Sequence, residues 1–175
     1  MTKQDTMQPV DLVVALALAA NRSDPSPTYS QLGQRLGLSA STTFGAVKHL
    51  RRSGLLHPGT HEPNTRELMN FLVHGVKHAF PPLFGREVKG VPTAHAGPSL
   101  NKLFEGAKPI VWPDMHGTVR GTGLTPLYPK ATELPKRNPA VYALLTLVDA
   151  IRSGQARERN AAIAALGKVL GSDAG

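Results

Sequence analysis

The sequence predicts a mainly α-helical protein with a helix-turn-helix head, a helical body and, within that body, an irregular proline- and glycine-rich segment that contains short strands. Two observations support this fold class. Apolar residues recur at helical spacing in successive stretches that end at glycine or proline. Residues 81–137 instead combine many prolines and glycines with short apolar runs. We therefore expect residues 1–63 to form the head and residues 64–175 to form the body.

The composition is compatible with a polyanionic partner. The 175 residues carry a formal net charge of +8 although only 18% of them are charged, so lysine and arginine clearly outnumber the acids. Such a surplus is typical of proteins that bind nucleic acid, and equally of soluble proteins that are merely basic. The absence of cysteine excludes disulfides, thiolate zinc sites and cysteine nucleophiles.

The first helix is expected at the longest apolar run, residues 10–20. This run contains one charged residue, Asp11, and is otherwise apolar all round, as in a helix that is buried on several sides. It is much shorter than the roughly 20 residues that cross a bilayer, and residues 1–5 do not lead into a cleavable signal. We expect a cytoplasmic protein that does not contact a membrane.

Two short helices joined by a tight turn are predicted next. Ser30 suits the N-cap or the first turn of the first helix, whose apolar residues lie at helical intervals: Tyr29, Leu32 and Leu36. Gly37 suits a left-handed position just beyond its end. Ser39 suits the N-cap of the second helix, expected over residues 40–53, which Gly54 would end. This order is typical of a helix-turn-helix motif.

The body is expected to contain three longer helices, over residues 65–80, 138–154 and 156–170. Between the first and the second of these, residues 109–112 and 118–120 are candidate strands. The whole of residues 81–137 should be ordered, because this segment has more buriable aromatic and aliphatic side chains than a solvated linker. The two C-terminal helices are candidates for a dimer interface, with ordinary core packing as the alternative.

The second helix of the motif has two opposite faces when its residues are placed at about 100° intervals. A docking face is apolar or small and comprises Thr43, Ala46, Val47 and Leu50. A presenting face begins with small residues and ends with basic ones, namely Ser41, Gly45, Lys48 and Arg52. Small residues allow the start of a helix to approach base edges in the major groove, while basic residues suit phosphates. The pattern predicts a recognition helix for DNA.

The position of each residue on these two helices predicts which part of the DNA it would contact. The residues expected to contact bases are Ser41, Thr42, Phe44, Gly45 and Lys48. The residues expected to contact phosphates are Ser30, Gln31, Arg35, His49, Arg51 and Arg52. Phe44 suits packing at the edge of the docking face as well as it suits a thymine methyl group. Each charged residue, taken alone, could also be an ordinary solvated side chain.

Residues 29–56 resemble the winged helix-turn-helix of bacterial regulators of the MarR type. The resemblance rests on residues at the spacing of that family: Leu32, Leu36, Gly37, Leu38, Ser39, Val47, Leu50, Gly54, Leu55 and Leu56. With residues 10–20 as the first helix of the family, it implies a winged-helix-like head that binds duplex DNA. Such regulators continue with a basic hairpin wing, for which residues 57–63 are too short and too rich in proline. Either the wing is lost, or residues 85–89 or 117–120 replace it.

Histidine spacing raises the question of a metal site. His74 and His78 lie four residues apart on an expected helix, which would let two imidazoles share an ion. Loop residues that could add ligands are His57, His61, Asp114 and His116. However, no HExxH frame surrounds the pair, and nucleophile-elbow, P-loop and dinucleotide-binding motifs are absent. We expect no enzymatic activity, catalytic residue, metal or cofactor.

The function expected from the sequence is transcriptional regulation by sequence-specific binding of double-stranded DNA. A repressor is favoured, because occupation of a promoter needs no further surface. A homodimer would place two recognition helices about 34 Å apart on an inverted-repeat operator. The alternative is a protein-binding module, such as an antitoxin or an assembly factor, that uses its helix-turn-helix head to contact a protein partner.

Overall fold

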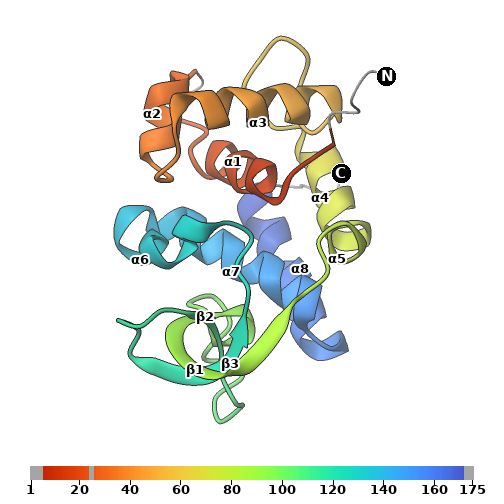
Figure 1. Cartoon of the computed structure of the whole chain (residues 1–175). Helices are drawn as coiled ribbons and strands as arrows, with labels where there is room; N and C mark the ends of the chain where they lie inside the picture. Colours follow the sequence, from red (N-terminus) through yellow and green to blue (C-terminus); the bar gives the residue numbers. More distant parts are fainter. Residues whose placement is uncertain (1–5, 24–25, 172–175) are drawn as a thin grey trace.

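Helix α1 (Pro9–Ala20) runs through the middle of the molecule, with further helices on two sides of it (Figure 1). In the computed structural model, which describes residues 6–23 and 26–171, nearly all of the α1 side chains are buried. This burial explains why the run is apolar on every face. Helix α3 (Ala40–Arg52) covers α1 on one side, and α7 (Pro139–Ser153) packs against it on the other. The protein is mainly helical with one small sheet, as expected.

The N-terminal helices follow the expected boundaries closely. Helix α2 (Tyr29–Gln34) precedes α3, which begins at the expected residue and ends one residue earlier than expected. Helices α2 and α3 lie together at one end of the molecule, above α1 in Figure 1. The head therefore consists of three helices stacked in two layers.

The helix expected over residues 65–80 is divided into α4 (Thr65–His74) and α5 (Val76–Ala79). The division falls at Gly75, and glycine is a poor helix former because its backbone is unrestricted. By contrast, the expectation of two C-terminal helices is confirmed by α7 and α8 (Ala156–Leu170). Asn138 caps α7 by accepting a hydrogen bond from the Val141 backbone N–H at 3.3 Å.

The proline- and glycine-rich segment is ordered and forms a small barrel at the end of the molecule opposite α3 (Figure 1). Its strands are β1 (Phe84–Thr93), β2 (Ile110–Pro113) and β3 (Val119–Leu124). Strand β1 pairs antiparallel with both others, and β2 pairs parallel with β3, which closes the sheet. A Cβ on Gly90 would overlap the Trp112 carbonyl oxygen, so glycine is what permits the tight curvature here. The two expected strands are confirmed, whereas β1 was not expected.

Three short helical turns accompany the barrel, one within it and two between it and α7. The 3-10 turn η1 (Ala94–Ala96) follows β1, and η2 (Pro129–Glu133) leads directly into α6 (Leu134–Arg137). Figure 1 shows α6 between the barrel and the α2–α3 pair, next to the start of α7. The segment formed by η2 and α6 therefore lies between the two ends of the molecule.

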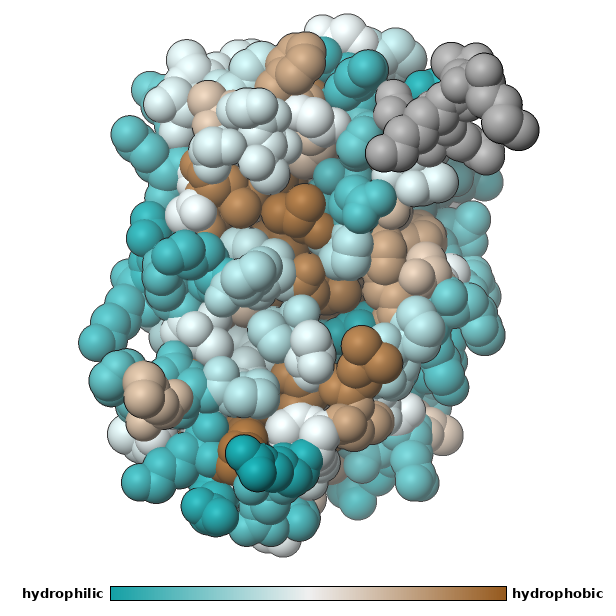
Figure 2. Space-filling model, in the orientation of Figure 1, coloured by the Kyte–Doolittle hydropathy of each residue, from teal (hydrophilic) through white to brown (hydrophobic). Residues whose placement is uncertain are grey.

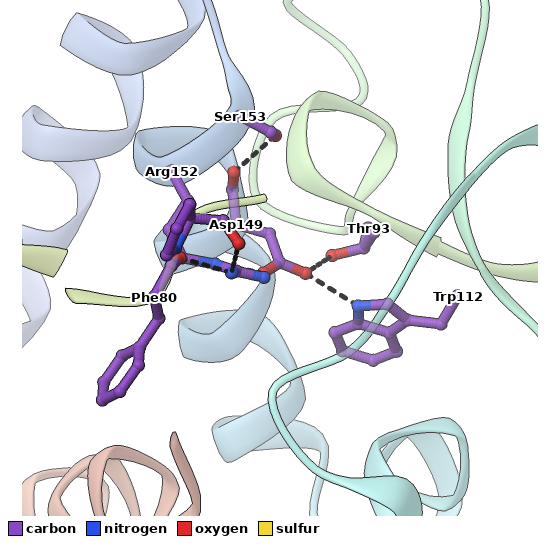
Figure 3. Close-up of polar contacts among 7 residues, drawn as sticks. Phe80, Thr93, Trp112, Asp149, Arg152 and Ser153 are labelled. Atoms are coloured by element: carbon purple, nitrogen blue, oxygen red, sulfur yellow. Dashed lines mark hydrogen bonds and ion pairs between the residues drawn. The ribbon is translucent and has the colours of Figure 1, made fainter. Parts of the chain in front are cut away.

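A buried polar network attaches the barrel to α7 (Figure 3). Asp149 Oδ2 accepts hydrogen bonds from Thr93 Oγ1 and Trp112 Nε1, each at 2.7 Å. Its Oδ1 forms an ion pair with Arg152 Nη2 at 2.9 Å, and Arg152 Nη1 donates to the Phe80 carbonyl at 2.7 Å. Burial raises the pKa of Asp149, and the neighbouring Arg152 cation opposes this rise. The network joins two strands to α7 at a single carboxylate, and Arg152 extends it to Phe80 at the end of α5.

The hydrophobic core is continuous across residue 63, where we expected the head to end. Buried side chains of α1 and α3 belong to the same core cluster as those of α7 and α8. In the face shown in Figure 2, hydrophobic side chains gather along the middle of the molecule, between more hydrophilic ends. The apolar residues that made α7 and α8 candidates for a dimer interface are mostly buried inside the chain: Val141, Leu144, Leu145, Val148, Ile151, Leu166 and Leu170.

None of the helices in the described part of the chain is both long and apolar enough to span a membrane.

Candidate nucleic-acid interface

Side-chain caps fix the starts of both helices in the α2–α3 pair. Thr28 caps α2, because its Oγ1 accepts from the Gln31 backbone N–H at 3.1 Å and the Gln31 Oε1 accepts from the Thr28 N–H at 2.9 Å. Ser30 therefore occupies the first turn, one of its two expected positions. Ser39 caps α3 as expected, accepting from the Thr42 backbone N–H at 3.1 Å. These bonds, reciprocal at α2 and single at α3, satisfy backbone groups that the helix starts would otherwise leave unpaired.

The turn between the helices requires glycine at two positions. Gly37 has a φ of +74°, a left-handed conformation that side chains disfavour. Gly33 lies inside α2, and its carbonyl accepts from the Leu38 N–H at 2.8 Å. A Cβ on Gly33 would lie 2.5 Å from the Leu38 carbonyl oxygen and 2.9 Å from Thr43 Oγ1. The close approach of α2 to α3 at Gly33 fixes the angle at which α3 projects.

We expect Gly33→Ala to lower the free energy of unfolding by about 1–3 kcal/mol, because the new methyl group meets backbone atoms that cannot rotate away. Urea unfolding followed by circular dichroism measures the loss. Gly45→Ala is the matched control, since it adds the same methyl group in α3 where nothing lies within 4 Å. Equal changes in the two variants would contradict this account of the turn.

The docking face of α3 is buried as the sequence predicts. Thr43, Ala46, Val47 and Leu50 each expose no more than 1% of their surface. The Thr43 hydroxyl donates to the Ser39 carbonyl at 2.9 Å, so its polar atom is satisfied within the helix. The packing of this face on α1 and α2 leaves the other side of α3 directed away from the core.

The presenting face of α3 is open to solvent. Ser41, Thr42, Lys48 and Arg52 are exposed, and Gly45 lies among them in mid-helix. The Thr42 hydroxyl accepts from the Ser39 hydroxyl at 2.9 Å, which orients it at the helix start. Because Gly45 has an ordinary helical conformation and nothing within 4 Å of its Cβ position, neither backbone geometry nor internal packing explains a glycine here. This face is thus small near its start and basic near its end.

Phe44 both packs within the protein and remains accessible. Its ring meets the Tyr29 ring edge-on, with centroids 5.3 Å apart and planes at 87°, and Tyr29 also lies 5.5 Å from the His61 ring. Even so, 53% of Phe44 is exposed. The two roles left open by the sequence are therefore compatible in this structure, because the ring packs against Tyr29 while about half of the residue stays exposed.

A short hairpin follows α3 and lies beside it at the same end of the molecule (Figure 1). It is closed by an antiparallel bridge between Leu56 and Pro63 and by the His57 N–H, which donates to the Glu62 carbonyl at 2.9 Å. Arg51 Nε donates to the Thr60 carbonyl at 3.0 Å and so holds the hairpin against α3. Burial, together with the nearby Arg51 charge, lowers the pKa of His61 in this hairpin.

The suggestion that a later segment replaces the wing is wrong. Residues 85–89 lie in β1, and residues 117–120 lead into β3. Both segments belong to the barrel, at the opposite end of the molecule from α3 (Figure 1). Sequence reasoning could not place them there, because their partners in the sheet are far apart along the chain.

His49 occupies a different place from the one expected for a phosphate contact. Its Nδ1 lies 2.8 Å from Oδ2 of Asp11, and the exposed fractions of the two side chains are 21% and 2%. Asp11 Oδ2 also accepts from the Gln8 N–H at 2.7 Å. Burial raises the pKa of Asp11, and these hydrogen bonds oppose the rise. His49 therefore links α3 to α1, and we remove it from the expected DNA contacts.

Stability should depend on pH through Asp11. A raised pKa in the folded state means that Asp11 contributes stability below its unfolded pKa and loses this contribution as the pH rises through the folded value. The free energy of unfolding of the native chain, relative to that of Asp11→Asn, should therefore fall as the pH rises from about 4 towards neutrality. Urea unfolding of both proteins over this range measures the difference. A difference that does not vary with pH would contradict the prediction.

The other residues that we expected to contact phosphates differ in exposure, and some of them form hydrogen bonds within the protein. Ser30 and Gln31 are exposed in the first turn of α2, with Gln31 engaged in the cap described above. Arg35 is half-buried at the end of α2, whereas Arg51 is half-buried and bonded to the hairpin. Sequence reasoning missed Asp11 as a partner of α3. The available signal was a single acid in an otherwise apolar helix, since a buried carboxylate needs a partner.

The histidines do not form a metal site in the part of the chain that the structure describes. His74 ends α4 and His78 lies on α5, and both are exposed. Within residues 6–23 and 26–171, no group of three or more histidines and acids is arranged to hold an ion.

No protein-family model, curated protein or solved structure matches this chain. The function is therefore inferred from the exposure, charges and contacts of α3 and its surroundings.

Proposed function

We propose that the chain is a sequence-specific, double-stranded DNA-binding transcriptional regulator, most simply a repressor, with a winged-helix-like head of the MarR type. In this proposal α3 enters the major groove with its N-terminal end first. Ser41, Thr42, Phe44 and Gly45 face base edges, and Lys48 and Arg52 face bases or phosphates further along. The hairpin at residues 56–63 takes the place of a reduced wing.

The observation that carries the proposal is Gly45, a half-buried glycine in the middle of α3 with nothing within 4 Å of its Cβ position. Glycine costs a helix roughly 1 kcal/mol relative to alanine, and the chain offers no internal reason for it at Gly45. A partner that comes close to the α3 backbone supplies a reason, and the major groove of DNA is such a partner. The exposed hydroxyl at Ser41 and the cations at Lys48 and Arg52 suit base edges and phosphates on either side of it.

A direct test compares two double variants in binding to duplex DNA taken from upstream of the coding sequence. Lys48→Ala with Arg52→Ala should weaken binding at low salt by at least about tenfold and reduce the salt slope by about 1 per residue. Fluorescence anisotropy over a range of salt concentrations measures both quantities. Lys77→Ala with Lys168→Ala removes the same charge from exposed sites on α5 and α8 and is the control.

Identical losses in both double variants would indicate binding through net charge alone and would overturn the placement of α3. Failure of the native chain to bind any duplex at low salt would overturn DNA binding and favour the protein-binding module. A homodimer on an inverted repeat should protect two sites about one helical turn apart in a footprint. A reporter fused to the same upstream DNA should be silenced by the native chain if the protein is a repressor.

A further inference from the structure

A cluster of charged side chains lies on one face of strands β1 and β3. Lys89 and Arg120 are partners in the antiparallel pairing of these strands, and two residues further along, Glu87 and Thr122 are paired in the same way. Because side chains alternate between the two faces of a strand, all four lie on the same face. We call these four residues and Lys108, whose Nζ lies 3.0 Å from Glu87 Oε2, the barrel face.

The opposite face of the same strands is the interior of the barrel. Gly121 and Gly123 alternate with the residues of the barrel face on β3, and both glycines are buried. A Cβ on Gly123 would lie 3.3 Å from Cγ2 of Val88, so Val88 points to this inner side as well. The barrel face is therefore an outer surface, and the exposed fractions of its Lys108 and Arg120 side chains are both 63%.

One carboxylate on the barrel face serves two of its three cations. Glu87 Oε2 contacts Lys108, and Glu87 Oε1 lies 3.3 Å from Arg120 Nε. Lys108 above all, and Arg120 with it, lower the pKa of Glu87 and keep it ionised. The Lys89 ammonium, directly opposite Arg120, has no partner among the described residues. Like charges directly opposite each other destabilise a sheet, so internal stability does not explain this pair of cations.

The excess positive charge of the barrel is concentrated on the barrel face. Residues 84–124 contain five lysines and arginines and three acids, and three of these cations but only one of the acids belong to the barrel face. The other two cations and two acids of the segment balance each other: Arg86, Lys102, Glu105 and Asp114. Residues 1–63, which contain α3, have the same excess of two positive charges over a longer stretch of chain. The barrel is therefore at least as basic as the head.

The chemistry of the barrel face suits phosphates better than it suits a protein partner. The centre of a protein–protein interface is depleted of charge and rich in aromatic side chains. The barrel face includes none of the exposed large hydrophobic residues in the described part of the chain. Protein–DNA interfaces are instead polar and positively charged, and hydroxyl groups join the cations in contacting phosphates. The Thr122 hydroxyl is available for such a contact, because no described residue bonds it.

The barrel and α3 cannot contact the same straight duplex. The barrel lies at the end of the molecule opposite α3 (Figure 1), and the presenting face of α3 is directed away from the core. A duplex seated on α3 therefore lies beyond the head, and the helical body separates it from the barrel.

We propose that the barrel face binds the phosphate backbone of a second duplex, so that one molecule bridges two segments of DNA. Lys89 and Arg120 contact phosphates, and Glu87 holds the Arg120 and Lys108 side chains in place between them. The contact does not depend on base sequence, because charge and hydroxyl groups are matched to the backbone alone. The bridging rests on the DNA-binding function proposed for α3, whereas binding at the barrel face does not.

Backbone amide NMR of the full chain maps both surfaces in a single titration with a short duplex at low salt. We expect saturable shifts at residues 87–89 and 119–122, in addition to shifts in α3. Polyglutamate of similar length and charge is the control for simple attraction between opposite charges, and it should shift the barrel signals less.

Two double variants show whether the charges of the barrel face are responsible. Lys89→Gln with Arg120→Gln, the barrel variant, should raise the Kd from the barrel shifts by at least about fivefold and reduce its salt slope by about 1 for each lost phosphate contact. Lys77→Gln with Lys168→Gln removes the same charge from exposed positions of α5 and α8 and should leave this Kd unchanged.

Three results would overturn the barrel face: shifts in α3 alone, equal barrel shifts with polyglutamate, or equal losses in the barrel variant and its control. Shifts at the barrel face without any in α3 would mean that the function proposed for α3 has failed while the barrel face stands.

A duplex fixed to beads tests the bridging. The native chain, bound to immobilised upstream DNA, should retain a second, fluorescent duplex of unrelated sequence. The barrel variant should retain at least about fivefold less of it, while its affinity for the upstream duplex alone stays within about twofold, because distant sites act independently. Full retention by the barrel variant would show that a second copy of α3 supplies the contact, and it would overturn the bridging. So would a native chain that holds the upstream duplex and no other.

Discussion

Asp149→Ala is expected to lower the free energy of unfolding by about 3–5 kcal/mol, the range for removing one partner of a buried ion pair. The change leaves the Arg152 cation buried without its counter-ion. It also removes the acceptor of the Thr93 hydroxyl and of the Trp112 indole N–H, both of which are buried. Since these groups hold the barrel on α7, the barrel should loosen before the helices unfold.

Two measurements separate loosening of the barrel from global unfolding. Trp112 is the only tryptophan in the chain, so its fluorescence reports on the barrel, whereas far-ultraviolet circular dichroism reports chiefly on the helices. In Asp149→Ala the fluorescence transition in urea should precede the circular dichroism transition. Glu105→Ala, at an exposed site in the loop between η1 and β2, is the control and should change neither. A loss below about 1 kcal/mol in Asp149→Ala would show that the network is not an anchor.

Gly45→Leu is expected to lower the affinity for DNA without lowering the stability of the protein. Leucine is a better helix former than glycine by roughly 0.5–1 kcal/mol, and nothing lies within 4 Å of the Cβ position, so the free energy of unfolding should rise or stay constant. The same side chain would fill the space between α3 and the floor of the major groove. We expect DNA affinity to fall at least about tenfold, because even a misfit of about 1.4 kcal/mol has this effect.

Anisotropy with the upstream duplex and urea unfolding of the same sample provide the two readouts. Ala164→Leu adds a leucine side chain to an exposed position of α8 and should leave DNA affinity unchanged. Unchanged affinity in Gly45→Leu would remove the presenting face of α3 from the interface. A fall in affinity together with a fall in stability would instead mean that the substitution disturbs the helix itself.

The elements that could be predicted from the sequence are those whose signals are local. Caps at Ser39 and Asn138 and the helical period of the docking face mark α3 and α7 within a few residues. Strand β1 has no such signal, because glycines and a proline interrupt it and only pairing with β2 and β3 makes it a strand. The division at Gly75 was not expected either, because the apolar stripe continues from α4 into α5 and only the glycine itself marks the break.

In the candidate site, too, only the features with a local sequence signal could be predicted. The exposure of Ser41, Lys48 and Arg52 follows from helical geometry, so it was predictable. The position of His49 was not, because its partner Asp11 lies on a helix 38 residues earlier in the chain. Asp11 and Asp149 share a usable signal, since each is an acid within a helix that is otherwise strongly apolar. Such an acid predicts a buried partner, although not which one.

The burial of α1 on two sides has a consequence for the order in which the chain can fold during synthesis. When α3 leaves the ribosome it can cover one side of α1, but α7 is made only after residue 138. Until then the other side of α1 has no partner and exposes aliphatic side chains, which makes the nascent chain a substrate for holding chaperones. A fragment that stops at residue 63 would remain in this condition permanently, so the isolated head should aggregate even though it contains the whole candidate interface.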